Sequence, residues 1–146
     1  MDAGIIKTIG RLALPLAHIS IFIIFFWFGF LKLLGVSPAN PLVEELLSKT
    51  LPFITFGQFI LILGVYEMII GVTFLIKGLE RVALTLLIPH VIVTTLPLIL
   101  LPQIAWHGAF SPTLEGQYII KNLAIVALAF SLIAHIRPMG TERQLR

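Results

Sequence analysis

The sequence predicts an all-α fold: an integral membrane four-helix bundle with a short amphipathic helix in the first outer loop. Hydrophobic residues make up 58% of the 146 residues and charged residues only 12%, about half the roughly 25% that is usual in soluble domains. Four apolar runs have the length of ~20 residues that a helix needs to cross a bilayer. A chain of this length forms one domain, so we expect a single membrane domain over residues 1–146.

The four predicted spans follow one another along the chain. They cover residues 12–34, 54–76, 82–102 and 118–136. Only residues 77–81 separate the second span from the third, so we expect these two spans to be antiparallel neighbours.

The connection over residues 35–53 predicts a short helix of its own. Asn40 is a residue type that caps helix N-termini, and Pro41 suits the first helical position. Over residues 42–49, apolar side chains fall on one helical face and charged side chains on the other. This pattern is typical of an amphipathic helix that lies on a membrane surface.

The second outer connection, residues 103–117, contains two further signals. Trp106 is a residue type that anchors chains at the membrane interface. Ser111 followed by Pro112 predicts the start of the fourth helix there.

Lysine and arginine residues divide unequally between the two predicted membrane faces. One face carries Lys7, Arg11, Lys77, Arg81, Arg137, Arg143 and Arg146, and the other carries Lys32, Lys49 and Lys121. Because positive residues concentrate on the cytoplasmic side, both termini are predicted to be cytoplasmic, in a prokaryotic inner membrane.

Composition also excludes several function classes. The sequence contains no cysteine, so disulfides, thiolate catalysis and zinc–thiolate sites are excluded, and we expect no metal site. The formal net charge is +3, but the basic residues are scattered between apolar runs and form no patch. Nucleic acid is therefore not an expected partner, whereas the lipid bilayer is.

The second span carries a glycine every seven residues. These are Gly57, Gly64, Gly71 and Gly78. Small residues on one helical face allow another helix to approach closely, so we expect this stripe to be a packing surface. Glu67 lies at the edge of the stripe. A carboxylate is costly inside hydrocarbon and packing does not require one, which makes Glu67 the main candidate functional residue.

Each predicted span has one polar or small face, and we expect the four faces to point inward. The residues concerned are His18, Gly29 and Lys32 in the first span, Glu67 in the second, His90, Thr94 and Pro97 in the third, and Lys121, Ala124, Leu128, Ser131 and His135 in the fourth.

Depth along the helices predicts two layers of polar residues. Glu67 and His90 should lie level near the midplane, and Lys32 and Lys121 should lie together near the outer end. A contact of Glu67 with either lysine would require about 10 Å to be bridged along the membrane normal. The alternative for both lysines is a structural role, in which they reach the outer interface. The sequence leaves open which of Lys32, Lys121 and His90 pairs with Glu67.

Four short motifs along the chain carry a family resemblance. They are FGFLK at 28–32, GVYEMIIG at 64–71, ER at 80–81 and EGQYIIKN at 115–122. Their order and spacing resemble the DoxX family of small four-helix membrane proteins. Lys32, Glu67, Arg81, Lys121 and Asn122 match the family pattern. The first outer loop is also similar to that of a related family of small inner-membrane proteins linked to reactive-chlorine stress.

The resemblance implies a function. Members of the DoxX family include the small subunit of an archaeal thiosulfate:quinone oxidoreductase and partners in oxidative-stress complexes. By analogy this chain is expected to be an accessory subunit of a redox or oxidative-stress system, with a quinone or lipid site between its helices. Such a subunit is not catalytic alone, and any quinone chemistry runs through a partner that supplies the electrons.

Two other function classes remain open. The intramembrane Glu67 and the prolines of the third span favour a carrier for a small solute or a proton, acting as a homo-oligomer. The glycine stripe favours a membrane-protein assembly factor that works within a larger membrane complex. No haem, flavin or iron–sulfur motif is visible, so quinone is the one cofactor considered.

Overall fold

The computed structural model describes residues 3–134, whose regular secondary structure is helical apart from one short hairpin. The elements are α1 (Ala3–Leu33), α2 (Asn40–Thr50), α3 (Phe56–Leu75), α4 (Glu80–Thr95), α5 (Pro97–Leu100), α6 (Pro102–Ala105), β1 (Trp106–Gly108), β2 (Ser111–Pro112) and α7 (Leu114–Ala134).

Within residues 3–134, four helical stretches are long and apolar enough to cross a bilayer. They are Lys7–Leu33, Phe56–Leu75, Glu80–Leu100 and Leu114–Ala134. Large apolar side chains are exposed along all four. These features indicate an integral membrane protein in a lipid environment. Positions 135–136 of the predicted fourth span, together with His135, Arg137, Arg143 and Arg146, lie outside the described residues, and the predicted orientation stays a prediction.

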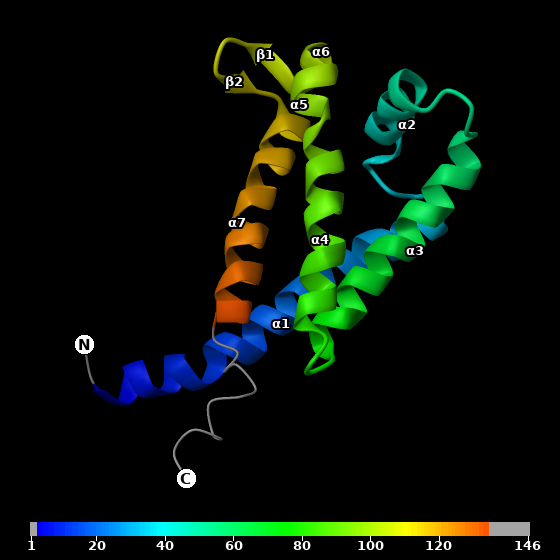
Figure 1. The fold of residues 1–146 in the computed structure, drawn as a ribbon. Coiled ribbons are helices and arrows are strands. Elements are labelled where there is room, and N and C mark those ends of the chain that lie inside the picture. Colours follow the sequence, from blue (N-terminus) through cyan, green and yellow to red (C-terminus); the bar gives the residue numbers. More distant parts are fainter. Residues whose placement is uncertain (1–2, 135–146) are drawn as a thin grey trace, which may run out of the picture.

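The long helices pack mainly as two pairs. α1 lies against α3 and α4 lies against α7, and α3 also contacts α4 (Figure 1). α1 and α3 are inclined to α4 and α7 in this view. The interior between them is filled by apolar side chains from all four helices, among them Ile21, Ile70, Leu87 and Ala129. The same interior receives the polar side chains described below.

The predicted amphipathic helix of the first loop is α2. Its cap differs from the prediction, because Ala39 occupies the N-cap position and makes no side-chain cap bond. The Asn40 amide instead donates to the Gly35 carbonyl at 3.2 Å. Leu47 is buried, and Lys49 Nζ donates to the Leu100 carbonyl at 3.3 Å. α2 is therefore held against α3 and α5.

The third and fourth spans differ from the predicted ones at their ends. The third is divided into α4 and α5, with Pro97 as the first residue of α5. Ser111 does not start the fourth helix, because residues 111–112 pair with β1 in a two-stranded hairpin. α7 begins three residues later, where the Thr113 hydroxyl accepts from the Gly116 amide at 3.1 Å. Trp106 donates its indole N–H to the Leu98 carbonyl at 2.9 Å, which ties the hairpin to α5.

Candidate functional site

The candidate site begins with a close approach of α1 and α3. A Cβ atom at Gly64 would lie 2.8 Å from the Gly29 carbonyl oxygen, and one at Gly29 would lie 2.5 Å from the Gly64 carbonyl oxygen. A Cβ at Gly71 would lie 2.9 Å from the backbone nitrogen of Phe26. Because neither glycine at the first crossing has a side chain, the two backbones touch there. This contact sets which residues of α1 and α3 lie opposite each other.

Lys32 lies one turn beyond Gly29 and reaches across to α3. Its Nζ donates to Glu67 Oε2 at 2.6 Å. Lys32 and Glu67 are each only 5% exposed. The Lys32 Cβ would be 3.2 Å from a Cβ at Gly64, so the missing side chain of Gly64 leaves room for the lysine stem. The ion pair and its short hydrogen bond reduce the cost of placing both charges in an apolar interior.

His90 of α4 approaches Glu67 from the other side. The distance from His90 Nε2 to Glu67 Oε1 is 3.5 Å, and His90 is 7% exposed. Three helices thus contribute one buried polar side chain each. We call Lys32, Glu67 and His90 the buried polar cluster.

Aromatic side chains surround the histidine of the cluster. The ring of Phe25 meets that of His90 edge-on, with centroids 5.4 Å apart, and the Tyr66 ring lies 6.2 Å away. The Tyr66 hydroxyl donates to the Leu86 carbonyl at 2.7 Å, one turn before His90. This bond attaches α3 to α4 beside the cluster. Tyr66 is not among the site residues predicted from the sequence, although a tyrosine inside a span needs a partner for its hydroxyl.

The cluster contains groups that can donate, accept and transfer a proton. Glu67 accepts from Lys32 with one oxygen and faces the imidazole with the other. An imidazole and a carboxylate at this separation can exchange a proton after a small side-chain movement. Lys32 has three N–H donors, and a carbonyl oxygen placed beside it could accept one. Within residues 3–134, no three His, Asp or Glu side chains are grouped so as to hold a metal ion.

The structure places the two lysines differently from the predicted layers. Lys32 does not pair with Lys121 but contacts Glu67. The reason is an offset between helices: Gly29 is four residues before the end of α1, whereas the opposing Gly64 is eight residues after the start of α3. At ~1.5 Å per residue, α3 extends about 6 Å further at this end than α1. The last turn of α1 is therefore level with the first half of α3, and Lys32 reaches Glu67 because helical side chains lean toward the N-terminus of their helix.

Lys121 and Asn122 lie away from the cluster. Lys121 is exposed, with Nζ 5.1 Å from the centroid of the Tyr118 ring, and Asn122 is half-buried. The predicted inward face of the fourth helix is largely wrong. Lys121, Ala124 and Ser131 of that face are exposed, and only Leu128 among its described members packs against the core. The buried residues of α7 are Gly116, Ile119, Ala129 and Leu132. Since lipid-facing and protein-facing surfaces are both apolar, helical periodicity did not distinguish them.

The glycine stripe of α3 is a packing surface over half its length only. Gly64 and Gly71 contact α1, whereas a Cβ at Gly57 or Gly78 would meet nothing within 4 Å. Gly57 lies in the first turn of α3, and Gly78 lies beyond its end in the α3–α4 turn with φ +92°. A positive φ favours glycine, so Gly78 serves the turn. Arg81, also predicted at this turn, is exposed in the first turn of α4.

His18 strengthens the α1–α3 pair at the opposite end of α3. Its Nδ1 donates to the Phe74 carbonyl at 2.5 Å. This carbonyl lies in the last turn of α3, where helix carbonyls lack helical partners. His18 therefore has a structural role in joining α1 to the end of α3.

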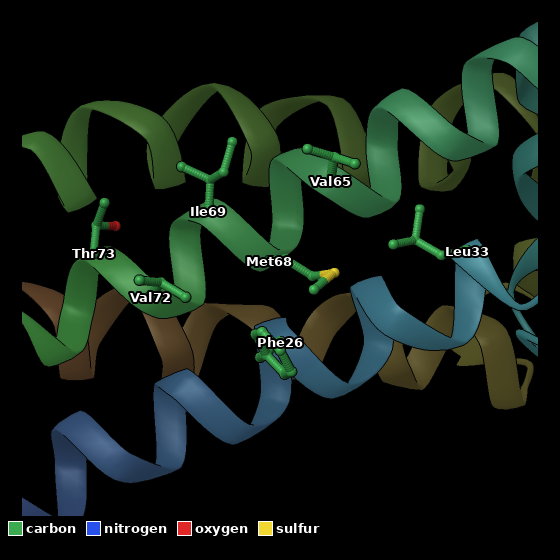
Figure 2. Close-up of a pocket in the computed structure, with 7 residues that line it drawn as sticks. All are labelled: Phe26, Leu33, Val65, Met68, Ile69, Val72 and Thr73. Atoms are coloured by element: carbon green, nitrogen blue, oxygen red, sulfur yellow. The ribbon is translucent and has the colours of Figure 1, made fainter.

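A pocket of about 340 Å³ lies on the outer side of the α1–α3 pair (Figure 2). It is lined by Phe26, Leu33, Val65, Met68, Ile69, Val72 and Thr73. No member of the buried polar cluster lines it, but Leu33 and Met68 are the chain neighbours of Lys32 and Glu67. Its apolar lining fits a hydrocarbon chain better than a polar group.

Comparison of the chain with protein-family models, curated proteins and solved structures gives no match. The buried polar cluster is therefore interpreted from its own geometry and from the sequence motifs.

Proposed function

We propose that this chain is an accessory membrane subunit of a redox or oxidative-stress system, and that its buried polar cluster binds a quinone-type headgroup and exchanges protons with it. One observation carries the proposal: Lys32, Glu67 and His90 come from three helices and meet in an interior that is otherwise apolar. Ionisable groups inside membrane proteins are costly and usually mark ligand or proton sites.

The motifs of the DoxX family support the same proposal. Lys32 and Glu67 both match that pattern, and they contact each other although 35 residues separate them. Lys121, Asn122 and Arg81 also match but lie outside the cluster, so they have no part in the proposed headgroup site.

The proposed chemistry divides between this chain and its partner. Reduction of a quinone to a quinol takes two electrons and two protons. The partner subunit would supply both electrons, and water would supply the two protons that His90 and Glu67 would relay to the quinone oxygens. Lys32 would donate a hydrogen bond to one carbonyl. The apolar pocket beside Leu33 and Met68 would hold part of the isoprenoid chain.

Purification in mild detergent tests the proposal. Quinone per protein is measured by extraction and mass spectrometry for the wild type, Glu67→Gln and Glu115→Gln. Glu115 is an exposed carboxylate of α7 and makes a matched control. We expect retained quinone in the wild type and the control, and at least a tenfold loss in Glu67→Gln.

Three outcomes of this experiment contradict the proposal. Folded wild-type protein without quinone would contradict the headgroup site. Equal retention in all three proteins would show that the cluster is not involved. Recovery of varied membrane proteins without quinone would favour an assembly factor instead.

A second function, proton or small-solute carriage by a homo-oligomer, is favoured by the division of the third span. α4 ends at Thr95 and α5 begins at Pro97, about two turns beyond His90. Discontinuous helices beside buried ionisable groups are typical of transport sites. Proteoliposomes containing a pH-sensitive dye would detect this activity as a proton flux that Glu67→Gln abolishes.

The proposed location is a prokaryotic inner membrane with both termini in the cytoplasm. The absence of cysteine allows labelling at single introduced sites. Ser48→Cys should react with an impermeant reagent from outside whole cells, and Lys77→Cys should not. The reverse pattern would overturn this orientation.

A further inference from the structure

The first half of α1 extends beyond the other long helices. His18 bonds to the last turn of α3, and α1 continues for fifteen residues on the N-terminal side of it, from Ala3 to Ala17. Every side chain described from Gly4 to Leu16 is exposed. Figure 1 shows this part of α1 running out past the ends of α4 and α7. Among the described residues, no other element covers it.

This projecting part has two distinct faces. At ~100° per residue, Ile5, Ile9, Leu12 and Leu16 form one apolar stripe, and all four are exposed. Lys7 and Arg11 lie on the opposite side of the helix, together with the exposed Leu14. The combination of an apolar stripe and a basic face is the pattern of helices that lie in a membrane interface.

The length of α1 also exceeds the thickness of the hydrocarbon core, so that its first residues can lie outside the core. The helix has 31 residues and is about 46 Å long at ~1.5 Å per residue. The hydrocarbon core is about 30 Å thick. Pro15 has no amide hydrogen for the Arg11 carbonyl and so permits a change of helix direction at this boundary.

Other basic residues lie at the same end of the molecule. Lys77 and Arg81 flank the α3–α4 turn and are exposed, and Glu80 is the acidic residue described there. The net charge of the described residues at this end is therefore positive.

We propose that residues 3–14 form a surface-bound helix that binds anionic phospholipid headgroups, with Ile5, Ile9 and Leu12, followed by Leu16 beyond Pro15, in the acyl layer and Lys7 and Arg11 at the headgroups. The bilayer itself covers the apolar stripe. This inference does not rest on the proposed function of the buried polar cluster.

A single fluorescent label on the full chain tests the proposal. Ile9→Cys, labelled with an environment-sensitive dye, is compared in nanodiscs of phosphatidylcholine alone and with 30% phosphatidylglycerol. Phe110→Cys, at the exposed hairpin turn, is the control label. We expect the Ile9 label to be protected from aqueous acrylamide in the anionic discs and quenched there by nitroxide lipids labelled near the headgroup. The Phe110 label should remain accessible in both.

Charge-removing variants sharpen the test. Lys7→Gln and Arg11→Gln should each lower the ratio of protected to accessible label about fivefold in anionic discs, and 1 M salt should have the same direction of effect. Lys121→Gln, an exposed lysine on α7, should leave the ratio unchanged. Equal protection with and without phosphatidylglycerol would overturn the anionic-lipid site. Protection in detergent that is lost when the protein is diluted at constant detergent concentration would show instead that a second copy covers the stripe.

Discussion

The α1–α3 pair and the α4–α7 pair are built from helices of similar composition but are held together differently. Backbone contact between Gly29 and Gly64 joins α1 to α3, and the Lys32–Glu67 ion pair is buried beside it. α4 and α7 also contact each other and contribute small side chains such as Ala83 and Ala129 to the apolar core, whereas Lys121 of α7 is exposed. The comparison shows that a lysine near a span end acquires a buried partner only where the helices approach closely.

Substituting Lys32 and Lys121 should give the largest difference in stability between the α1–α3 pair and the α4–α7 pair. Lys32→Met removes the partner of a buried carboxylate and should lower the free energy of unfolding by about 3–5 kcal/mol. Lys121→Met changes an exposed side chain and should cost about 0.5 kcal/mol or less. Steric trapping in bicelles measures both. Similar losses for the two variants would contradict the assignment of Lys32 to the interior.

A double substitution tests whether the loss comes from an unpaired charge. Lys32→Met combined with Glu67→Leu removes both charges and should recover most of the stability lost in Lys32→Met, leaving a deficit of about 1–2 kcal/mol. The same double variant should retain no quinone if the proposed function holds. If the loss of unfolding free energy in the double variant equals the sum of the losses in the two single variants, the two side chains do not interact.

The glycines of α3 allow the close approach itself to be tested. Gly64→Ala places a methyl group 2.8 Å from a backbone oxygen that cannot easily move, so we expect a loss of about 1–3 kcal/mol. Gly57→Ala meets open space and should be neutral or stabilising by up to about 1 kcal/mol, because alanine favours helix. The midpoint of thermal unfolding in one detergent ranks these variants. A tolerated Gly64→Ala would mean that α1 and α3 are further apart.

Removing the hydrogen bond that links α3 to α4 should have the smallest effect on the free energy of unfolding. Tyr66→Phe removes the hydrogen bond to the Leu86 carbonyl and should cost about 1 kcal/mol. Tyr118→Phe, on the exposed face of α7, is the matched control and should change little. If the hydroxyl of Tyr66 does not connect α3 to α4, the two variants will have the same stability.

Much of the fold could be predicted from the sequence, because span length and apolar composition follow directly from bilayer thickness. The amphipathic pattern likewise indicated α2. The hairpin was missed, since residues 106–112 carry no alternating pattern and their strands are very short.

The candidate site was predicted by residue type but not by arrangement. The cost of burial singled out Glu67, and its level with His90 followed from residue counts. The contact of Glu67 with Lys32 depends on how far α3 extends past the end of α1. Counting residues along either helix does not give that distance. The orientation of α7 depends on which apolar face meets protein, and the sequence pattern of an apolar helix does not encode that choice clearly.

The separation of Lys32 and Glu67 along the chain has a consequence for biosynthesis. Lys32 leaves the ribosome 35 residues before Glu67, an interval of about 2–7 s at typical bacterial and eukaryotic elongation rates. During this interval α1 carries a lysine without its carboxylate. Its place in the last turn of α1 lets the ammonium group reach the water interface until Glu67 arrives. The same position that pairs with Glu67 in the finished protein thus permits α1 to enter the membrane first.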